Sequence, residues 1–248
     1  IDKISLEKAP DITISSDSDL IPHDENNLAY QAAKLILEKN GKKAGVKIFI
    51  EKNIPIGAGL AGGSSNAAAV LLGINKLYNL NLSHQVLQEL AGKLGSDVPF
   101  CLTNTSALAR GRGEKLTPLP NIEKLHFLLV KPDFQVSTAQ VYKEFDLEKV
   151  RQVPDTKAFL KAWQEYDIIS LANNMQNVLE SVCLPKYPEI NKIKLDMLKY
   201  GALNAIMSGS GPTVLGLFND QEKLHRAYTG FLQDYKEVFK ISSYIRGE

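Results

Sequence analysis

The stretch IPIGAGLAGGSSNAAAV, residues 54–70, places four glycines and two serines shortly before a run of alanines. Alanine favours helix, so a helix is predicted over residues 66–78 with the glycines at its start. A glycine backbone can approach an anion closely, and the first-turn amides of a helix are unpaired at the positive end of its dipole. The stretch therefore predicts a phosphate-binding loop, in which the Ser64 and Ser65 hydroxyls can donate to phosphate oxygens or face Mg²⁺.

Other interpretations of these glycines fit less well. Gly57, Gly59 and Gly62 match G-x-G-x-x-G, but that dinucleotide-binding motif leaves a strand directly and is followed by a second strand with an acidic residue. Here "EKNIP" intervenes, and residues 77–83 lead to another helix. A Walker loop needs a Lys before its Ser or Thr, which is absent. A purely structural role, in which the glycines permit a sharp turn beside small alanines, stays open.

The rest of the chain alternates strands and helices before it becomes mainly helical. Alternating apolar residues predict strands at 11–15 and 46–50, and Ser83 is a plausible cap for a helix over 83–94. Residues 202–218, "ALNAIMSGSGPTVLGLF", predict a strand, a glycine turn and a second strand. The change to mainly helical sequence near residues 146–155 is the predicted domain boundary.

Composition excludes several classes of protein. Lys plus Arg number 29 against 28 Asp plus Glu, a net charge of +1, so no overall field favours nucleic acid as a partner. The longest apolar stretches, such as 67–74, are far shorter than the roughly 20 residues of a membrane-spanning helix. Cys101 and Cys183 stand singly among apolar neighbours, which favours buried thiols. The four histidines show no metal-ligand spacing.

The glycine stretch also indicates a protein family. "PIGAGLAGGSSNAA" (55–68) is similar to the phosphate-binding motif of the kinases named for galactose, homoserine, mevalonate and phosphomevalonate, the GHMP kinases. "SGSGPTVLGLF" (208–218) resembles their glycine-rich C-terminal motif, although alone it could be a hairpin turn. The resemblance extends through most of the chain, in "ENNLAYQAAKLI" (25–36), "LGSDVPFCL" (94–102), "GRGE" (111–114), "VSTAQVY" (136–142) and "YPEI" (187–190).

This resemblance implies a fold and an activity. The fold is α+β with two domains: residues 1–148, like domain 2 of ribosomal protein S5, and residues 149–248, ferredoxin-like. The branch that this chain most resembles uses ATP with Mg²⁺ to phosphorylate a hydroxyl of a cytidine diphosphate derivative of methylerythritol, in the non-mevalonate isoprenoid pathway. The resemblance also implies a small-molecule substrate, a cytoplasmic location, and neither nucleic acid nor membrane as a partner.

Site residues follow from the matched motifs. Asp97 in "GSDVPF" matches the catalytic aspartate, which orients the attacking hydroxyl and takes its proton. The nucleotide side is Asn27, Lys52, Pro55, Gly57, Gly59, Leu60, Gly62, Gly63, Ser64, Ser65 and Asn66. The substrate side is Val136, Ser137, Thr138, Ser210 and Gly211. The resemblance identifies no metal ligands.

Each of these assignments has a structural alternative. Ser96 or Asp97 could instead cap a helix, and Ser137 could cap the helix that it precedes. Asn27 could be an ordinary amide at a helix start, and Lys52 a solvated surface lysine. Asn66 could be an ordinary first-turn residue.

The chain departs from the family at its start. Members open with a "PAKINL"-like strand, whose lysine works beside the catalytic aspartate, and a Gly-Tyr-His loop that contacts the cytosine; the sequence contains neither. We expect a fragment of a complete enzyme whose first strands are missing. The alternatives are a truncated, inactive homologue and a nucleotide-binding module without activity. The sequence does not indicate an oligomeric state.

Overall fold

A computed structural model describes residues 1–41, 44–103, 105–122, 124–150 and 152–243. The chain forms two compact units. The first unit comprises residues 1–56 and 61–119, and the second comprises residues 57–60 and 120–248. Each unit combines sheet and helices, so the predicted α+β class is confirmed.

The first unit is built on a three-stranded sheet with β3 (Gly45–Glu51) at its centre. β1 (Lys3–Ala9) pairs antiparallel with β3, and β2 (Thr13–Ser16) pairs parallel with it. Alternate residues of β3, namely Val46, Ile48 and Ile50, are fully buried. The predicted alternation over 46–50 therefore faces one side of the sheet into the core.

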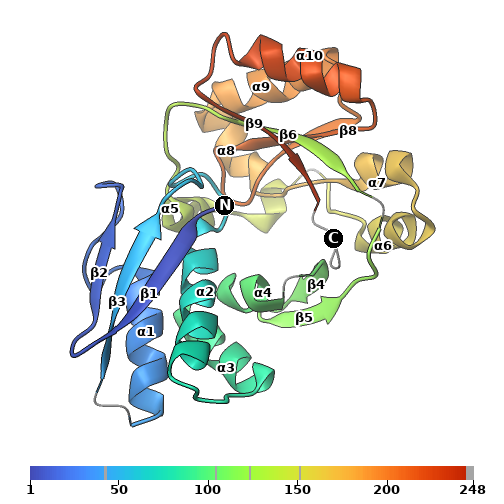
Figure 1. Cartoon of the computed structure of the whole chain (residues 1–248). Helices are drawn as coiled ribbons and strands as arrows, with labels where there is room; N and C mark the ends of the chain where they lie inside the picture. Colours follow the sequence, from blue (N-terminus) through green and yellow to red (C-terminus); the bar gives the residue numbers. More distant parts are fainter. Residues whose placement is uncertain (42–43, 104, 123, 151, 244–248) are drawn as a thin grey trace. The chain divides into compact units, whose positions relative to one another are not determined.

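Two long helices, α1 (Leu28–Lys39) and α2 (Gly62–Leu77), pack side by side on this sheet (Figure 1). Next come α3 (His84–Leu94), capped by Ser83 as predicted, and the short α4 (Val98–Thr103), both packed against α2. β4 (Ala107–Arg110) and β5 (Lys115–Pro118) form a hairpin around "GRGE". α2 begins at Gly62, four residues earlier than predicted, because the glycines and serines themselves form its first turn.

The second unit contains an antiparallel sheet in the order β7 (Asn204–Met207), β8 (Val214–Phe218), β6 (His126–Lys131), β9 (Glu237–Ser242). α9 (Pro188–Lys199) and α10 (Gln221–Phe231) pack on one face of this sheet. α6 (Thr156–Glu165) and α7 (Ile168–Asn174) pack on each other and join a smaller apolar cluster. The remaining helices are α5 (Thr138–Glu144), the 3₁₀ turn η1 (Leu147–Lys149) and α8 (Glu180–Lys186).

The division between the units falls earlier than the predicted domain boundary. β6 pairs with both β8 and β9, so residues 120–148 belong to the second unit with strands that follow much later in the chain. The division of the chain at 148/149 stays a prediction about the family's domains. In the part of the chain that the structure describes, no helix combines the length and apolar character needed to cross a membrane.

Candidate functional site

No side chain caps the start of α2, the longest of the described helices. Side-chain oxygens cap α1, α3, α5, α6, α7 and α10, whereas α8 and α9, like α2, have no side-chain cap. Its N-cap residue, Ala61, has a left-handed backbone with φ of +52°, which is strained for a residue with a Cβ. Strained backbone of this kind gathers at functional sites. The amides at the positive end of the α2 dipole thus have no side-chain acceptor from the cap position.

First-turn donors are available at this end. The Ser65 amide donates to the Ala61 carbonyl at 2.9 Å and so begins the helical ladder. The amides of Gly62, Gly63 and Ser64 precede it and have no partner within the helix. Gly63 is exposed, and Gly62, Ser64 and Ser65 are half-buried, so this turn is not sealed inside the core. The Ser65 hydroxyl donates to the Gly62 carbonyl at 2.8 Å, and Asn66 is turned into the buried face of α2.

Gly62 is held closely by its surroundings. A Cβ at this position would lie 3.1 Å from Ile54 Cγ2 and 3.2 Å from Lys52 Nζ. We call residues 57–65 the glycine loop. A side chain on Gly62 would therefore push against Lys52 and Ile54, in the segment that connects β3 to this loop. Pro55, predicted on the nucleotide side, is half-buried in the same segment.

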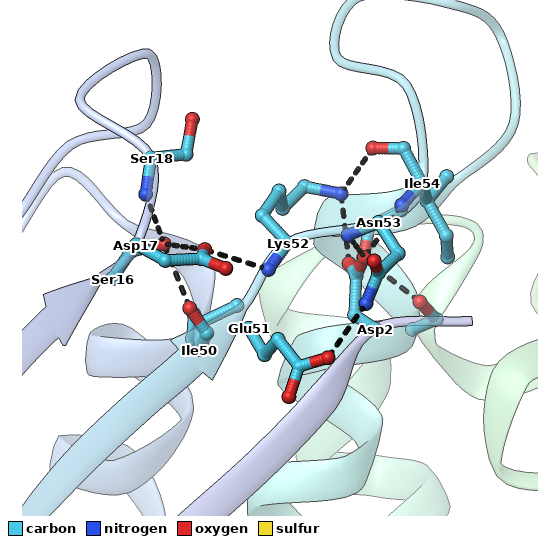
Figure 2. A network of polar contacts seen from close by, with 11 residues as sticks. Asp2, Ser16, Asp17, Ser18, Ile50, Glu51, Lys52, Asn53 and Ile54 are labelled. Carbon is cyan, nitrogen blue, oxygen red and sulfur yellow. Dashed lines mark hydrogen bonds and ion pairs between the residues drawn. The ribbon is translucent and has the colours of Figure 1, made fainter.

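Lys52 is not the solvated surface lysine of the structural alternative. Its side chain is 6% exposed, and its ammonium donates to Asp2 Oδ2 at 2.7 Å and to the Ile54 carbonyl at 2.5 Å (Figure 2). Burial by itself raises the pKa of Asp2, but the amides of Ile54 and Asn53 and the Lys52 ammonium outweigh it and hold this pKa below its ordinary value. The Asp2 carboxylate is therefore charged at neutral pH.

Asn27 lies at the start of α1. Its side chain accepts from the Ala29 amide at 2.9 Å and donates to the Pro22 carbonyl at 2.8 Å. Asn27 therefore caps α1, which is the structural role considered for it above. Its contact with a nucleotide stays a prediction. The neighbouring Leu28 lies 3.7 Å from a Cβ built on Gly63, which brings the starts of α1 and α2 together.

In the second unit, residues 57–60 contact the C-terminal glycine turn. The Ser208 hydroxyl donates to the Gly59 carbonyl at 3.0 Å. A Cβ on Gly59, whose φ is +70°, would lie 2.3 Å from the Ser208 carbonyl oxygen and 3.0 Å from the Gly211 nitrogen. The two glycine-rich motifs thus meet backbone to backbone, where a side chain on Gly59 does not fit. Leu60 is half-buried beside them.

The residues predicted on the substrate side, including Gly211, all lie in the second unit. The hydroxyls of Thr138 and Ser210 share a hydrogen bond of 2.7 Å, although 72 residues separate them. Val136 is buried at 6% exposure. Ser137 caps α5 by accepting from the Gln140 amide, which is the structural role considered for it above.

Asp97 lies in the exposed turn before α4, in the first unit. Within the residues that the structure describes, its carboxylate makes no capping bond to α4, while its backbone carbonyl accepts from the Cys101 amide at 3.2 Å. The pKa of the Cys101 thiol is raised to about 11, mainly by burial and to a smaller extent by the negative charge of Asp97. The "GRGE" hairpin reaches the same turn, since a Cβ on Gly113 would lie 3.2 Å from the Ser96 carbonyl oxygen.

Three residues that hold the segments of the candidate site were not predicted from the sequence. Asp2 pairs with Lys52, Ser208 donates to Gly59, and the Asn177 amide donates to the carbonyls of Met207 and Gly209, both at 2.7 Å. Each acts across a long sequence separation. Ser208 stands in a motif that the sequence did single out, whereas nothing local marks Asp2 or Asn177.

Comparisons with known proteins identify the family of this chain. The GHMP kinases N terminal domain matches residues 27–105, and the GHMP kinases C terminal domain matches residues 159–237. A protein of Syntrophomonas wolfei, called 4-diphosphocytidyl-2-C-methyl-D-erythritol kinase, is 56% identical over 98% of this chain and 85% of its own length. A protein of the same description from Alkaliphilus metalliredigens is 45% identical over 99% of this chain and 85% of its own length.

Solved structures show the same fold. A crystal structure of 4-(cytidine 5'-diphospho)-2C-methyl-D-erythritol kinase has a TM-score of 0.80 and 33% identity, covering 97% of this chain and 85% of that chain. Homoserine kinase from Cytophaga hutchinsonii has a TM-score of 0.82 at 22% identity, covering 98% of this chain and 86% of that chain, a likeness of fold. With both GHMP domains matched and relatives this similar over nearly its whole length, the chain belongs to the 4-diphosphocytidyl-2-C-methyl-D-erythritol kinase family of the GHMP kinases.

Proposed function

We propose that this protein transfers the γ-phosphoryl group of ATP to a hydroxyl of 4-diphosphocytidyl-2-C-methyl-D-erythritol. The observation that carries the proposal is the uncapped, half-exposed start of α2, where the amides of Gly62, Gly63 and Ser64 have no partner in the helix. Phosphoryl transfer asks a protein mainly to position groups and to stabilise charge. Unpaired amides at a helix dipole supply the second of these requirements.

The remaining roles are assigned from the matched motifs. Asp97 orients the attacking hydroxyl and accepts its proton, for which an exposed carboxylate without a capping bond is available. Gly57, Gly59 and Leu60 belong to the same sequence motif and are assigned to nucleotide binding. Thr138 and Ser210, joined by their hydroxyls, lie on the acceptor side with Val136. Asn27 and Lys52 are assigned to the adenosine side of the nucleotide site, and Asn66 to the phosphate contacts.

Mg²⁺ is proposed to arrive with ATP. In the described residues, no group of three or more His, Cys, Asp or Glu side chains could hold a metal ion. The Ser64 and Ser65 hydroxyls offer the hard oxygen ligands that Mg²⁺ takes beside phosphate oxygens. When bound, the ion neutralises charge on the transferred phosphoryl group. The cytoplasm, where ATP is abundant, is the proposed compartment.

A coupled assay of ADP release from the full-length gene product tests this function. We expect release that depends on 4-diphosphocytidyl-2-C-methyl-D-erythritol and stays at background with galactose, homoserine or mevalonate. Binding of ADP without acceptor-dependent release would favour the alternative, a nucleotide-binding module or a truncated, inactive homologue. The comparisons offer nothing in favour of that alternative.

A further inference from the structure

The segment between β3 and the glycine loop is held from both neighbouring strands (Figure 2). From the β2 side, Asp17 Oδ1 accepts from the Lys52 amide at 2.9 Å. From the β1 side, Asp2 Oδ1 accepts from the amides of Asn53 and Ile54, each at 2.7 Å. Residues 52–54 therefore leave the sheet in one fixed conformation.

Asp2 makes the larger share of these contacts. Its second oxygen accepts from the Lys52 ammonium, which also donates to the Ile54 carbonyl. Carboxylate, ammonium and backbone thus form a closed set of bonds. The Asp2 side chain is 2% exposed, so solvent does not weaken the bonds.

The Asp2–Lys52 pair reaches the proposed phosphate site through Gly62. The Lys52 ammonium lies 3.2 Å from the place of a Cβ on the first residue of α2, and Ile54 lies equally close to that place. Because Lys52 and Ile54 lie against Gly62, displacement of residues 52–54 would disturb the amides in the first turn of α2. Hydrogen bonds weaken when their distance and angle depart from the ideal, so displaced amides would bind the phosphates less tightly.

We propose that Asp2 is a positioning residue for ATP: it holds Lys52 and the amides of residues 53 and 54 against the start of α2, and so keeps the phosphate-binding amides in place without touching the nucleotide. This inference rests on the proposed function, and names a residue on which nucleotide binding depends. The neighbouring ion pair between Lys3 and Glu51 offers a contrast. It lies one register position away on the same two strands, but its side chains are 70% and 40% exposed.

The first test measures steady-state kinetics of Asp2→Asn, with Lys3→Met as the matched control. We expect Asp2→Asn to raise KM for ATP about tenfold, with kcat and KM for the acceptor changed about twofold or less, because the reacting groups themselves are intact. Lys3→Met should match the wild type. A KM for ATP within twofold of the wild type in a folded Asp2→Asn variant would overturn the inference. A purely structural role of Asp2 would lower the melting temperature without raising KM for ATP relative to kcat.

Two further variants cover loss of folding and the role of Lys52. If Asp2→Asn does not fold, Asp2→Glu keeps the charge on a longer side chain; it should still raise KM for ATP, and an unchanged KM would reject the inference. In a double-mutant cycle, Asp2→Asn should add little to Lys52→Met, because both remove one interaction. Independent, additive effects would show that Asp2 does not act through Lys52.

Calorimetric titration with ADP separates this inference from the proposed function. A wild type without acceptor-dependent ADP release contradicts the function. A wild type that binds ADP no more tightly than Asp2→Asn contradicts the positioning role, whatever the acceptor is. Tighter binding by the wild type, with Lys3→Met equal to it, supports the positioning role.

Discussion

The hydroxyl of Ser208 donates a hydrogen bond of 3.0 Å to the carbonyl of Gly59, a residue 149 positions earlier in the chain. The contact joins the two glycine-rich motifs at a distance where the backbones themselves touch. The Asn177 amide also holds the C-terminal turn, by donating to the carbonyls of Met207 and Gly209. The conformation of residues 57–60 therefore depends on a turn that forms far along the sequence.

Gly59→Ala tests this close approach. Its Cβ would lie 2.3 Å from a backbone oxygen, and φ of +70° strains any residue with a Cβ. Gly41→Ala is the matched control, because its φ is +60° and nothing lies within 4 Å of the Cβ. In urea unfolding we expect Gly41→Ala to lose about 1 kcal/mol from strain alone, and Gly59→Ala at least about 2 kcal/mol. Equal losses would mean that the backbones can separate freely.

Gly62→Val tests the start of α2. Because its side chain would meet Ile54 and the Lys52 ammonium, we expect ADP to bind about tenfold more weakly in calorimetry. Gly92→Val, in the middle of α3 with nothing within 4 Å of its Cβ, should bind ADP like the wild type. Unchanged ADP affinity in Gly62→Val would place the phosphates elsewhere.

Most elements around this site could be predicted from local sequence. The alternation of residues 46–50, the cap at Ser83 and the two strands around "SGSGPT" each depend on neighbours in the chain, and the structure has them as predicted. The unit division was not predictable in this way. The place of β6 follows from its pairing with β8 and β9, and local periodicity does not show which strands pair.

The candidate site divides similarly. The uncapped glycine start of α2 has a local signature, so the phosphate loop could be proposed from residues 54–70 alone. Asp2 could not, because a single acidic residue before a strand is ordinary. Its importance comes from the register that sets β1 beside β3 and thereby places Asp2 against residues 52–54.

Asp97→Asn tests the proposed base. The substitution keeps the shape of the side chain and removes its charge and its ability to accept a proton. We expect kcat to fall by about 10² or more, with ADP affinity within about twofold of the wild type. Glu89→Gln, an exposed carboxylate on α3, serves as the control and should keep full turnover. Unchanged turnover in Asp97→Asn would assign proton transfer to another group.

Asp2 should make stability depend on pH in acid. Because its pKa in the folded protein is lowered, its carboxylate contributes stability that is fully present above the unfolded pKa of about 3.9 and is lost as pH falls through the lower folded value. The difference in free energy of unfolding between wild type and Asp2→Asn should therefore be constant above about pH 5 and shrink below about pH 4. Urea unfolding across this range measures it. A difference independent of pH would contradict the charged pair.

Cys101 should be unreactive at neutral pH, although it is only partly buried. With a pKa of about 11, only about 10⁻³ of the thiol is ionised at pH 8, and the thiolate is the nucleophile. In a Cys183→Ala background, we expect iodoacetamide to alkylate native Cys101 at least about 100-fold more slowly than the urea-unfolded chain. Adding Asp97→Asn removes the smaller of the two causes of the raised pKa, so alkylation should accelerate while staying slower than in the unfolded chain. An unchanged rate would show that the Asp97 charge does not act on this thiol.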